Sequence, residues 1–296
     1  CGATAYTIVS RNLVRMIAGG AASHSEHARH VLHTVHELAE GKTKDYEIKS
    51  PEKLHKLAEK LGVETLNRDD KEILKDVAEL AYADFGRFKD EPPAFLDSFL
   101  IDQRRDKFNS TNIMPRNIDG TVTELMAQTA QGVDADPVNI IFGGLKGSLA
   151  DLLGEYIGTN LSDVLFGIPE PIVSEANLGV IDEKMVNIAV HGHNPVLSEM
   201  VVAAARELKD EAVKVGAEGV NIVGICCTGN ELLMREGVYL ATSSASQEMA
   251  ILTGALEAMV VDIQCIYPSV QTLADCYHTK IITTEPIMKI PGAKHI

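Results

Sequence analysis

The sequence predicts an α/β protein in which an N-terminal helical domain is followed by a doubly wound parallel sheet. Apolar residues recur at helical spacing through the first half of the chain. In the second half, short β-rich apolar runs alternate with helical patterns, which is typical of a parallel sheet. The change between the two patterns falls at IPEP, residues 168–171. We therefore expect a helical domain over 1–169 and an α/β domain over 170–296.

The helices of the first half are predicted from apolar periodicity and from residues that favour helix ends. Apolar positions across 3–18 follow a helical period, and Gly19-Gly20 end the run. A second helix begins at Ser23, which forms a capping-box pattern with Glu26, and it ends at Gly41. After a polar linker, further helices are expected over 51–62, 69–86, 119–131 and 146–165.

Three apolar runs in the second half are predicted to be strands. They are VNIAV (186–190), VNIVGI (220–225) and MVVDI (259–263), and KIITT (280–284) reads as a further strand. Each of the three is followed by a loop and then by a helical pattern. The helices between strands are expected over 196–215, 229–236, 245–257 and 268–276.

Composition narrows the classes of protein that fit this fold. The 296 residues carry a formal charge of −15, 5% aromatic residues and no Trp, which opposes non-specific nucleic-acid binding. No apolar run approaches the roughly 20 residues that cross a bilayer. We expect a cytoplasmic protein with no nucleic-acid partner and no transmembrane segment. Because the chain opens on Cys1 without Met and stops at PGAKHI, we also expect an internal piece of a longer polypeptide, cut within its α/β domain.

Ligand-type side chains follow three successive predicted strands. HGHNP brings His191 and His193, CCTGNE brings Cys226 and Cys227, and QCIYPS brings Cys265. In a doubly wound sheet, the carboxyl ends of the strands form the edge where ligands bind. Thiolate ligands select zinc, copper or iron–sulfur groups over magnesium or calcium. The sequence therefore predicts a metal site at this edge.

Each of these residues also has an ordinary structural interpretation. A lone buried cysteine is usually a small apolar core residue, and we expect this of Cys276. Only one of the neighbours Cys226 and Cys227 can bind a metal, and the Thr-Gly that follows favours Cys227. His191 is expected to support the loop. The five cysteines are too few and too scattered for a disulfide framework, and they contain no CxxC pair.

Half of the ten histidines lie in the segment HSEHARHVLHTVH. They occupy every third position, so on a helix the row rises about 4.5 Å per step and drifts slowly around the axis. The pKa of a histidine side chain lies nearest to neutrality, so a row of histidines favours proton transfer or metal binding. The alternative is that these histidines simply form a polar face of the helix. His36 is displaced furthest from His24 by the drift, and we expect it to be a surface residue.

Four long motifs together resemble a known family. CGATAYTIVSRNLVRMIAGGAASHSEHARHVLHT, HGHNPVLSEM, GICCTGNELLMREG and MVVDIQCIYPS occur in the order found in the nickel–iron–sulfur carbon monoxide dehydrogenases of anaerobic microbes. The resemblance covers most of the chain. It implies oxidation of CO with water to CO2, two protons and two electrons. It also implies a Ni-4Fe-4S cluster (the C-cluster), [4Fe-4S] clusters for electron transfer, and a Rossmann-like, cluster-binding domain over 170–296.

The resemblance implies a role for each matching residue. His193, Cys227 and Cys265 would bind the C-cluster, and Cys1 would bind a [4Fe-4S] cluster (the B-cluster). His24 would be the catalytic residue nearest the chemistry, and the proton relay would continue through His27, His30 and His33. The remaining cluster ligands, including the thiolate of nickel, would lie outside this sequence, so the chain alone is expected to be inactive.

The resemblance also implies partners and leaves alternatives. A ferredoxin-like electron acceptor and a second copy in a homodimer are expected, and the motifs leave open whether acetyl-CoA synthase is a partner. The nearest alternative is a hybrid-cluster (hydroxylamine reductase) relative, against which HGHNP and CCTGNE argue. Another is a non-catalytic iron–sulfur scaffold subunit, and the last is a plain α/β binding protein whose cysteines all lie in its core.

Overall fold

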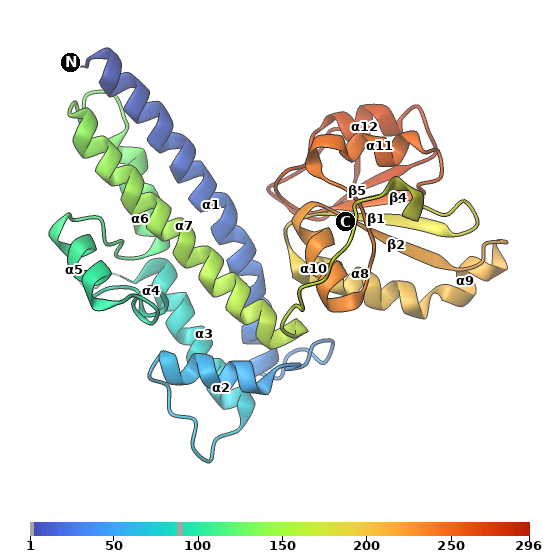
Figure 1. Cartoon of the computed structure of the whole chain (residues 1–296), viewed down its shortest axis with the longest axis horizontal. Helices are drawn as coiled ribbons and strands as arrows, with labels where there is room; N and C mark the ends of the chain where they lie inside the picture. Colours follow the sequence, from blue (N-terminus) through green and yellow to red (C-terminus); the bar gives the residue numbers. More distant parts are fainter. Residues whose placement is uncertain (1–2, 88–90) are drawn as a thin grey trace. The chain divides into compact units, whose positions relative to one another are not determined.

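The computed structural model describes residues 3–87 and 91–296, and the chain divides into two compact units between Phe166 and Gly167. The first unit is helical and the second is an α/β unit (Figure 1). Within the described residues, no helix is long and apolar enough to cross a bilayer.

The helical unit opens with α1 (Ala5–Ala39), a single helix of 35 residues where two helices were predicted. Its capping box is formed by Thr4 and Thr7, whose hydroxyls each accept a hydrogen bond from the other's backbone N–H at 3.2 Å. Gly19 and Gly20 lie inside the helix although each costs about 1 kcal/mol of helix propensity. The helix continues because residues on both sides of the glycines are buried and pack against a second long helix, α7 (Pro137–Phe166).

Six further helices complete this unit in the part of the chain that the structure describes. Those that overlap predicted helices are α2 (Pro51–Lys60), α3 (Asp70–Gly86), α6 (Ile118–Gln128) and α7 (Pro137–Phe166), the last of which begins nine residues before the predicted start at 146. The short helices α4 (Ala94–Asp97) and α5 (Asp102–Ser110) were not predicted. The four residues of α4 are too few to show a helical period, and α5 contains a single apolar residue, Phe108, so no amphipathic period marks either helix.

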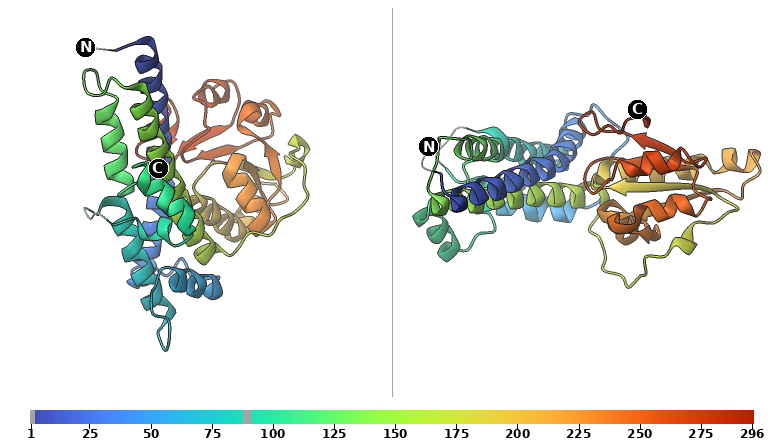
Figure 2. Two further views of the ribbon diagram at one scale, coloured as in Figure 1. Left: turned by 60° about the vertical axis from the view of Figure 1, so that its left-hand side comes forward. Right: turned by 90° about the horizontal axis from the view of Figure 1, so that it is seen from above.

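Helices α1 and α7 run side by side along the unit, as both views show (Figure 2). Glycines on α7 permit the close approach. A Cβ at Gly154 would lie 3.4 Å from Cα of Ser25, and one at Gly158 would lie 3.3 Å from Cα of Ala28. This contact sets the histidine-rich half of α1 against α7.

The second unit is built on a six-stranded parallel sheet with the order β3-β2-β1-β4-β5-β6. The strands are β1 (Val186–Gly192), β2 (Val220–Ile225), β3 (Leu240–Thr242), β4 (Ala258–Val261), β5 (Lys280–Thr283) and β6 (Lys294–His295). This is the Rossmann order, in which the strand sequence reverses between β1 and β4. The prediction of an α/β protein with a doubly wound parallel sheet is confirmed.

Helices cover both faces of this sheet (Figure 1). On one face α11 (Gln247–Leu252) and α12 (Ser269–Ala274) pack with Ala189 of β1, and on the other α8 (Pro195–Glu207) and α10 (Cys226–Glu236) pack with Val190. Successive strand residues point to opposite faces, so neighbouring apolar residues of β1 supply both cores. The short α9 (Lys209–Lys214) follows α8.

Candidate metal centre

Strand β1 lies between β2 and β4, and their carboxyl ends are in register. His191 of β1 is opposite Ile225 of β2 and Val261 of β4. The residues that follow these three strands therefore emerge at one edge of the sheet, next to the point where the strand order reverses. Ligands bind at such a switch point in doubly wound folds.

His193 follows β1 in a loop that is fixed by the buried carboxyl group of Asp262. Oδ1 and Oδ2 of Asp262 accept hydrogen bonds from the backbone N–H groups of His193 and Asn194, both at 2.7 Å. Burial raises the pKa of Asp262 to about 7 although the N–H donors of His193, Asn194 and Ile263 act in the opposite direction. A Cβ at Gly192 would collide with this carboxyl group, and Gly192 also has a φ of 140°. Only glycine fits there.

The adjacent cysteines after β2 differ in exposure. Cys227 is exposed in the first turn of α10, whereas Cys226 is buried and has a left-handed backbone with φ of 63°. Burial raises the pKa of the Cys226 thiol, and the nearby Cys265 and Cys227 raise it further. Cys226 therefore favours the protonated thiol. Cys226 and Cys227 follow β2 and Cys265 follows β4, so the three cysteines lie at the same edge of the sheet.

Cys265 lies in the loop after β4 and is exposed. Gln264 and Cys265 have φ of 69° and 56°, so two consecutive side-chain-bearing residues adopt the left-handed conformation. The backbone carbonyl of Cys265 accepts a hydrogen bond from the side-chain amide of Gln247 at 3.0 Å. Gln247 also contacts the buried ring of His191, at 3.0 Å from Oε1 to Nε2. Burial lowers the pKa of His191, so its ring is neutral.

The donor set fits a multinuclear cluster better than a single ion. The edge offers two exposed thiols and one imidazole, and such soft ligands bind iron–sulfur groups, zinc or copper. The donor atoms of His193, Cys227 and Cys265 do not all lie within 4.8 Å of one another. Three ligands bound to one ion at roughly 2.0–2.3 Å would lie closer together than that. A cluster, which bridges ligands over a greater span, is compatible with the arrangement.

In the helical unit, His24 of α1 forms a hydrogen bond with Asp151 of α7. His24 Nδ1 lies 2.7 Å from Asp151 Oδ1 and 3.8 Å from Glu155 Oε1, and the side chains of His24 and Asp151 are about one-third exposed, at 35% and 33%. A carboxylate at this distance orients the imidazole ring.

Along the rest of the histidine row, exposure increases towards the end of α1. His27 is buried, His30 is half-buried and His33 is exposed. His36 was expected on the surface. It is half-buried, lies 3.3 Å from Glu40 and packs edge-on against the ring of Tyr82. The drift of the row thus turns His36 towards α3.

Two further sequence predictions concern cysteines outside this edge. Cys1 lies outside the described residues. The expectation that Cys276 is a core residue is wrong, because this thiol is exposed after the end of α12. Asp151, Gln247 and the role of Asp262 were not predicted from the sequence. Of these three residues, only Asp262 could have been identified from the sequence, because it is an acidic residue inside the apolar run MVVDI.

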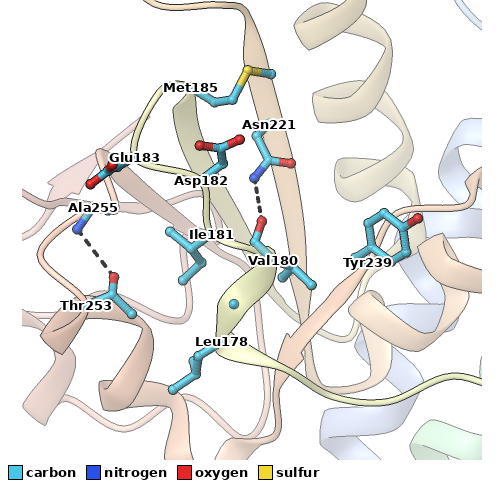
Figure 3. A pocket seen from close by; sticks show the side chains of 11 residues that line it. Leu178, Val180, Ile181, Asp182, Glu183, Met185, Asn221, Tyr239, Thr253 and Ala255 are labelled. Atoms are coloured by element: carbon cyan, nitrogen blue, oxygen red, sulfur yellow. Dashed lines mark hydrogen bonds between the residues drawn. The ribbon is translucent and has the colours of Figure 1, made fainter.

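A cavity of about 730 Å³ lies at the opposite, amino-terminal edge of the sheet (Figure 3). Its lining includes Asp182 and Met185 before β1, Asn221 at the start of β2, and Ala255 before β4. The side-chain amide of Asn221 donates a hydrogen bond to the backbone carbonyl of Val180 at 2.9 Å. None of the predicted metal ligands lies in this cavity.

A Rossmann-order sheet with thiols and imidazole at its switch point defines an α/β protein of the metal-binding type. The whole chain, residues 1–296, matches the Prismane/CO dehydrogenase family. The chain belongs to this family, and the resemblance inferred from its motifs is confirmed.

Individual relatives are similar over the full chain. Carbon monoxide dehydrogenase 1 of Carboxydothermus hydrogenoformans is 53% identical over 100% of this chain and 47% of its own length. The carbon monoxide dehydrogenase/acetyl-CoA synthase subunit beta of Moorella thermoacetica is 51% identical over 100% of this chain and 44% of its own. The chain thus spans about half the length of these relatives.

Solved structures match equally well. The as-isolated, nickel-free crystal structure of the carbon monoxide dehydrogenase from Thermococcus sp. AM4, produced without CooC maturase, is 50% identical. It superposes with a TM-score of 0.96 over 99% of this chain and 47% of that one.

Proposed function

We propose that the polypeptide carrying this chain is an anaerobic carbon monoxide dehydrogenase. It oxidises CO with water to CO2, two protons and two electrons. The observation that carries the proposal is the placement of His193, Cys227 and Cys265 after three adjacent strands at the switch point of the sheet. Relatives about 50% identical over the whole chain and named carbon monoxide dehydrogenase support this over the hybrid-cluster and scaffold alternatives.

We propose that His193, Cys227 and Cys265 bind a Ni-4Fe-4S cluster. When bound, this group supplies the redox centre that activates CO and water and takes up the two electrons. Cys227 is exposed, whereas Cys226 is buried and burial raises the pKa of its thiol; this supports Cys227 as the ligand, because the thiolate is the form that binds metal.

His24 is proposed as the catalytic residue that accepts a proton from the reaction. Its hydrogen bond to Asp151 holds the ring and stabilises the imidazolium that forms. The proton relay then continues along α1 through His27, His30 and His33. The increase in exposure from His27 to His33 supports this direction, since protons must reach water.

The remaining roles concern electrons and partners. Cys1 is proposed as a ligand of a [4Fe-4S] cluster, from which electrons pass to a ferredoxin-like acceptor. A homodimer is proposed because α1 exposes Tyr6, Val9 and Met16 on its surface, at 78%, 66% and 68%, and exposed apolar patches of this kind mark interfaces. Acetyl-CoA synthase is a candidate partner because the Moorella relative is named for that complex.

We further propose that residues 1–169 form a helical domain and 170–296 a Rossmann-like, cluster-binding domain. The thiols of Cys226, Cys227, Cys265 and Cys276 are free, which suits a reducing compartment, and we propose the cytoplasm.

The test is CO-dependent reduction of a viologen dye by the complete polypeptide, prepared without oxygen and replete with nickel and iron. We expect dye reduction that requires CO and stops when nickel is withheld. A nickel- and iron-replete protein that reduces no dye under CO would contradict the enzymatic proposal. Hydroxylamine reduction by a protein without nickel would favour the hybrid-cluster alternative.

A further inference from the structure

We propose that Gln247 is a positioning residue for the candidate metal centre: its buried side-chain amide fixes the Cys265 loop and joins it, through His191, to the loop that carries His193. The inference rests on the proposed function in that Cys265 and His193 are taken as cluster ligands. It adds a residue that touches neither the cluster nor its substrates.

The hydrogen bonds of Gln247 use both ends of its amide group. The side chain lies at the start of α11 and is fully buried. Nε2 donates to the backbone carbonyls of Ser244 at 2.8 Å and Cys265 at 3.0 Å. Oε1 accepts from the backbone N–H of Tyr267 at 3.0 Å and lies 3.0 Å from His191 Nε2. Two donors and two acceptor sites are thereby occupied, which is the full capacity of a glutamine side chain.

These contacts determine the orientation of the amide and the tautomer of His191. Both neighbours of Nε2 are carbonyl oxygens and one neighbour of Oε1 is an N–H group, so the reversed amide would lose three bonds. Oε1 can only accept, and therefore His191 Nε2 carries the hydrogen and donates it. Two buried side chains are locked in one arrangement.

The Cys265 loop requires such support. Gln264 and Cys265 adopt the left-handed conformation in succession, which side-chain-bearing residues rarely do. A strained backbone of this kind persists only where its surroundings determine it. Gln247 binds the carbonyl of Cys265 and the N–H of Tyr267, so it spans the segment directly after the strained pair.

His191 extends this support to the other candidate ligands. It is fully buried at the end of β1, two residues before His193. In the sheet, His191 is paired with Ile225 of the neighbouring strand β2. Ile225 directly precedes Cys226-Cys227, so the His191–Gln247 pair contacts the backbone that leads to each of the three candidate ligands. Supporting contacts of this type orient metal ligands, and their loss typically weakens metal binding by about 10–100-fold.

The test compares Gln247→Leu, Gln247→Glu and a matched control in the complete, metal-loaded polypeptide. Glutamate retains the acceptor oxygen for Tyr267 and His191 but loses the donors to Cys265 and Ser244, whereas leucine loses both. The control is Gln271→Leu, which removes an amide that donates to Asp275 on the exposed side of the same unit. The measurements are release of nickel and iron to a chelator, the EPR spectrum of the reduced clusters, and exchange of the Tyr267 amide hydrogen.

We expect both Gln247 variants to release nickel at least about tenfold faster than the wild type and to shift the EPR signal, and Gln271→Leu to do neither. The Tyr267 amide should stay protected in Gln247→Glu and exchange faster in Gln247→Leu. General destabilisation would not produce this difference in Tyr267 amide exchange between the two variants. Melting temperatures measure any such destabilisation separately. Wild-type metal release and an unchanged EPR spectrum in both Gln247 variants would overturn the inference. If the wild type holds its clusters but oxidises no CO, the proposed function fails, while iron release still decides the role of Gln247.

Discussion

Cys227 is the exposed member of an adjacent cysteine pair. Its side chain is exposed at the start of α10, whereas the thiol of Cys226 is buried with a raised pKa. We predict that Cys227→Ser lowers the nickel content of the complete polypeptide about tenfold or more, because a cluster ligand is lost. Cys276→Ser, which removes an exposed thiol after α12, is the control and should leave the metal content unchanged. Equal nickel contents in the two variants would contradict the assignment.

Asp151 is predicted to assist proton transfer through His24. Asp151→Asn keeps the size of the side chain but removes the charge that lies 2.7 Å from His24 Nδ1. Proton transfer by a positioned side chain typically contributes 10²–10⁴-fold, and we expect loss of the orienting carboxylate to slow CO oxidation by about tenfold with little change in KM for CO. Steady-state kinetics across pH measure this. Asp119→Asn, which removes a partner of Arg29 in the same unit, is the control. An Asp151→Asn variant with wild-type kcat at every pH would exclude the role.

The sequence indicated the candidate ligand residues but not the residues that hold the functional side chains in place. His193, Cys227 and Cys265 could be found because each follows an apolar run, and strand ends converge in a parallel sheet. Asp151 could not be found, because its contact with His24 joins residues 127 positions apart on two helices. Gln247 could not be found either, because its contacts depend on the fold of the loops around it.

The pairing of α1 with α7 depends on small residues at their contact. A Cβ at Gly158 would already lie 3.3 Å from Cα of Ala28, so a larger side chain must push the helices apart. We predict that Gly158→Leu lowers the free energy of unfolding by about 1–3 kcal/mol, as overpacking typically does. Urea unfolding of the chain measures the change. The control is Gly20→Leu, which lies in open space on α1 and should be neutral or stabilising. Gly132→Leu would not be a suitable control, because Gly132 has a φ of 84° and any side chain there is strained. Equal stabilities of Gly158→Leu and Gly20→Leu would contradict this account.

The link between α3 and α4 should make stability depend on pH through Asp84. Its carboxyl oxygens accept from the backbone N–H groups of Ala94 and Phe95, both at 2.8 Å, and burial raises its pKa from 3.8 to about 6 against the effect of these donors. The folded state then holds a proton that the unfolded state has released. The stability contributed by that proton is complete below pH 4 and is lost as the pH rises through about 6, by up to about 3 kcal/mol.

Asp84→Asn removes this titration but keeps one acceptor oxygen. The difference in unfolding free energy between wild type and variant should therefore change between pH 4 and 6 and be constant above pH 7. Urea unfolding at several pH values measures it. A difference that is constant from pH 4 to 7 would show that Asp84 does not titrate in this range.

Helix and strand positions were predictable where the apolar period was long, and the failures have physical causes. Gly19-Gly20 indicated a break in α1, but packing on both sides outweighs the local preference of two glycines. Ser23 consequently lies inside a helix and caps nothing. The edge strands β3 and β6 have three and two residues, too few to show any alternation.

Over the whole chain, topology rather than local motif brings the chemistry together. The candidate ligands lie on loops after β1, β2 and β4, and none is within 30 residues of the next along the chain. The Rossmann strand order places these loops side by side, so a doubly wound sheet predicted from sequence also predicted a shared edge. The strand order itself could not be predicted, because it depends on which buried faces the crossover helices cover.

The most direct test of the central claim is anomalous X-ray diffraction at the iron and nickel edges from crystals of the complete, metal-replete polypeptide. We predict one cluster of anomalous peaks with iron at roughly 2.3 Å from the sulfurs of Cys227 and Cys265, by analogy with zinc thiolates, and at bonding distance from a ring nitrogen of His193. Anomalous peaks that lie away from these three side chains, or beside Cys226 in place of Cys227, would contradict the assignment of the metal centre.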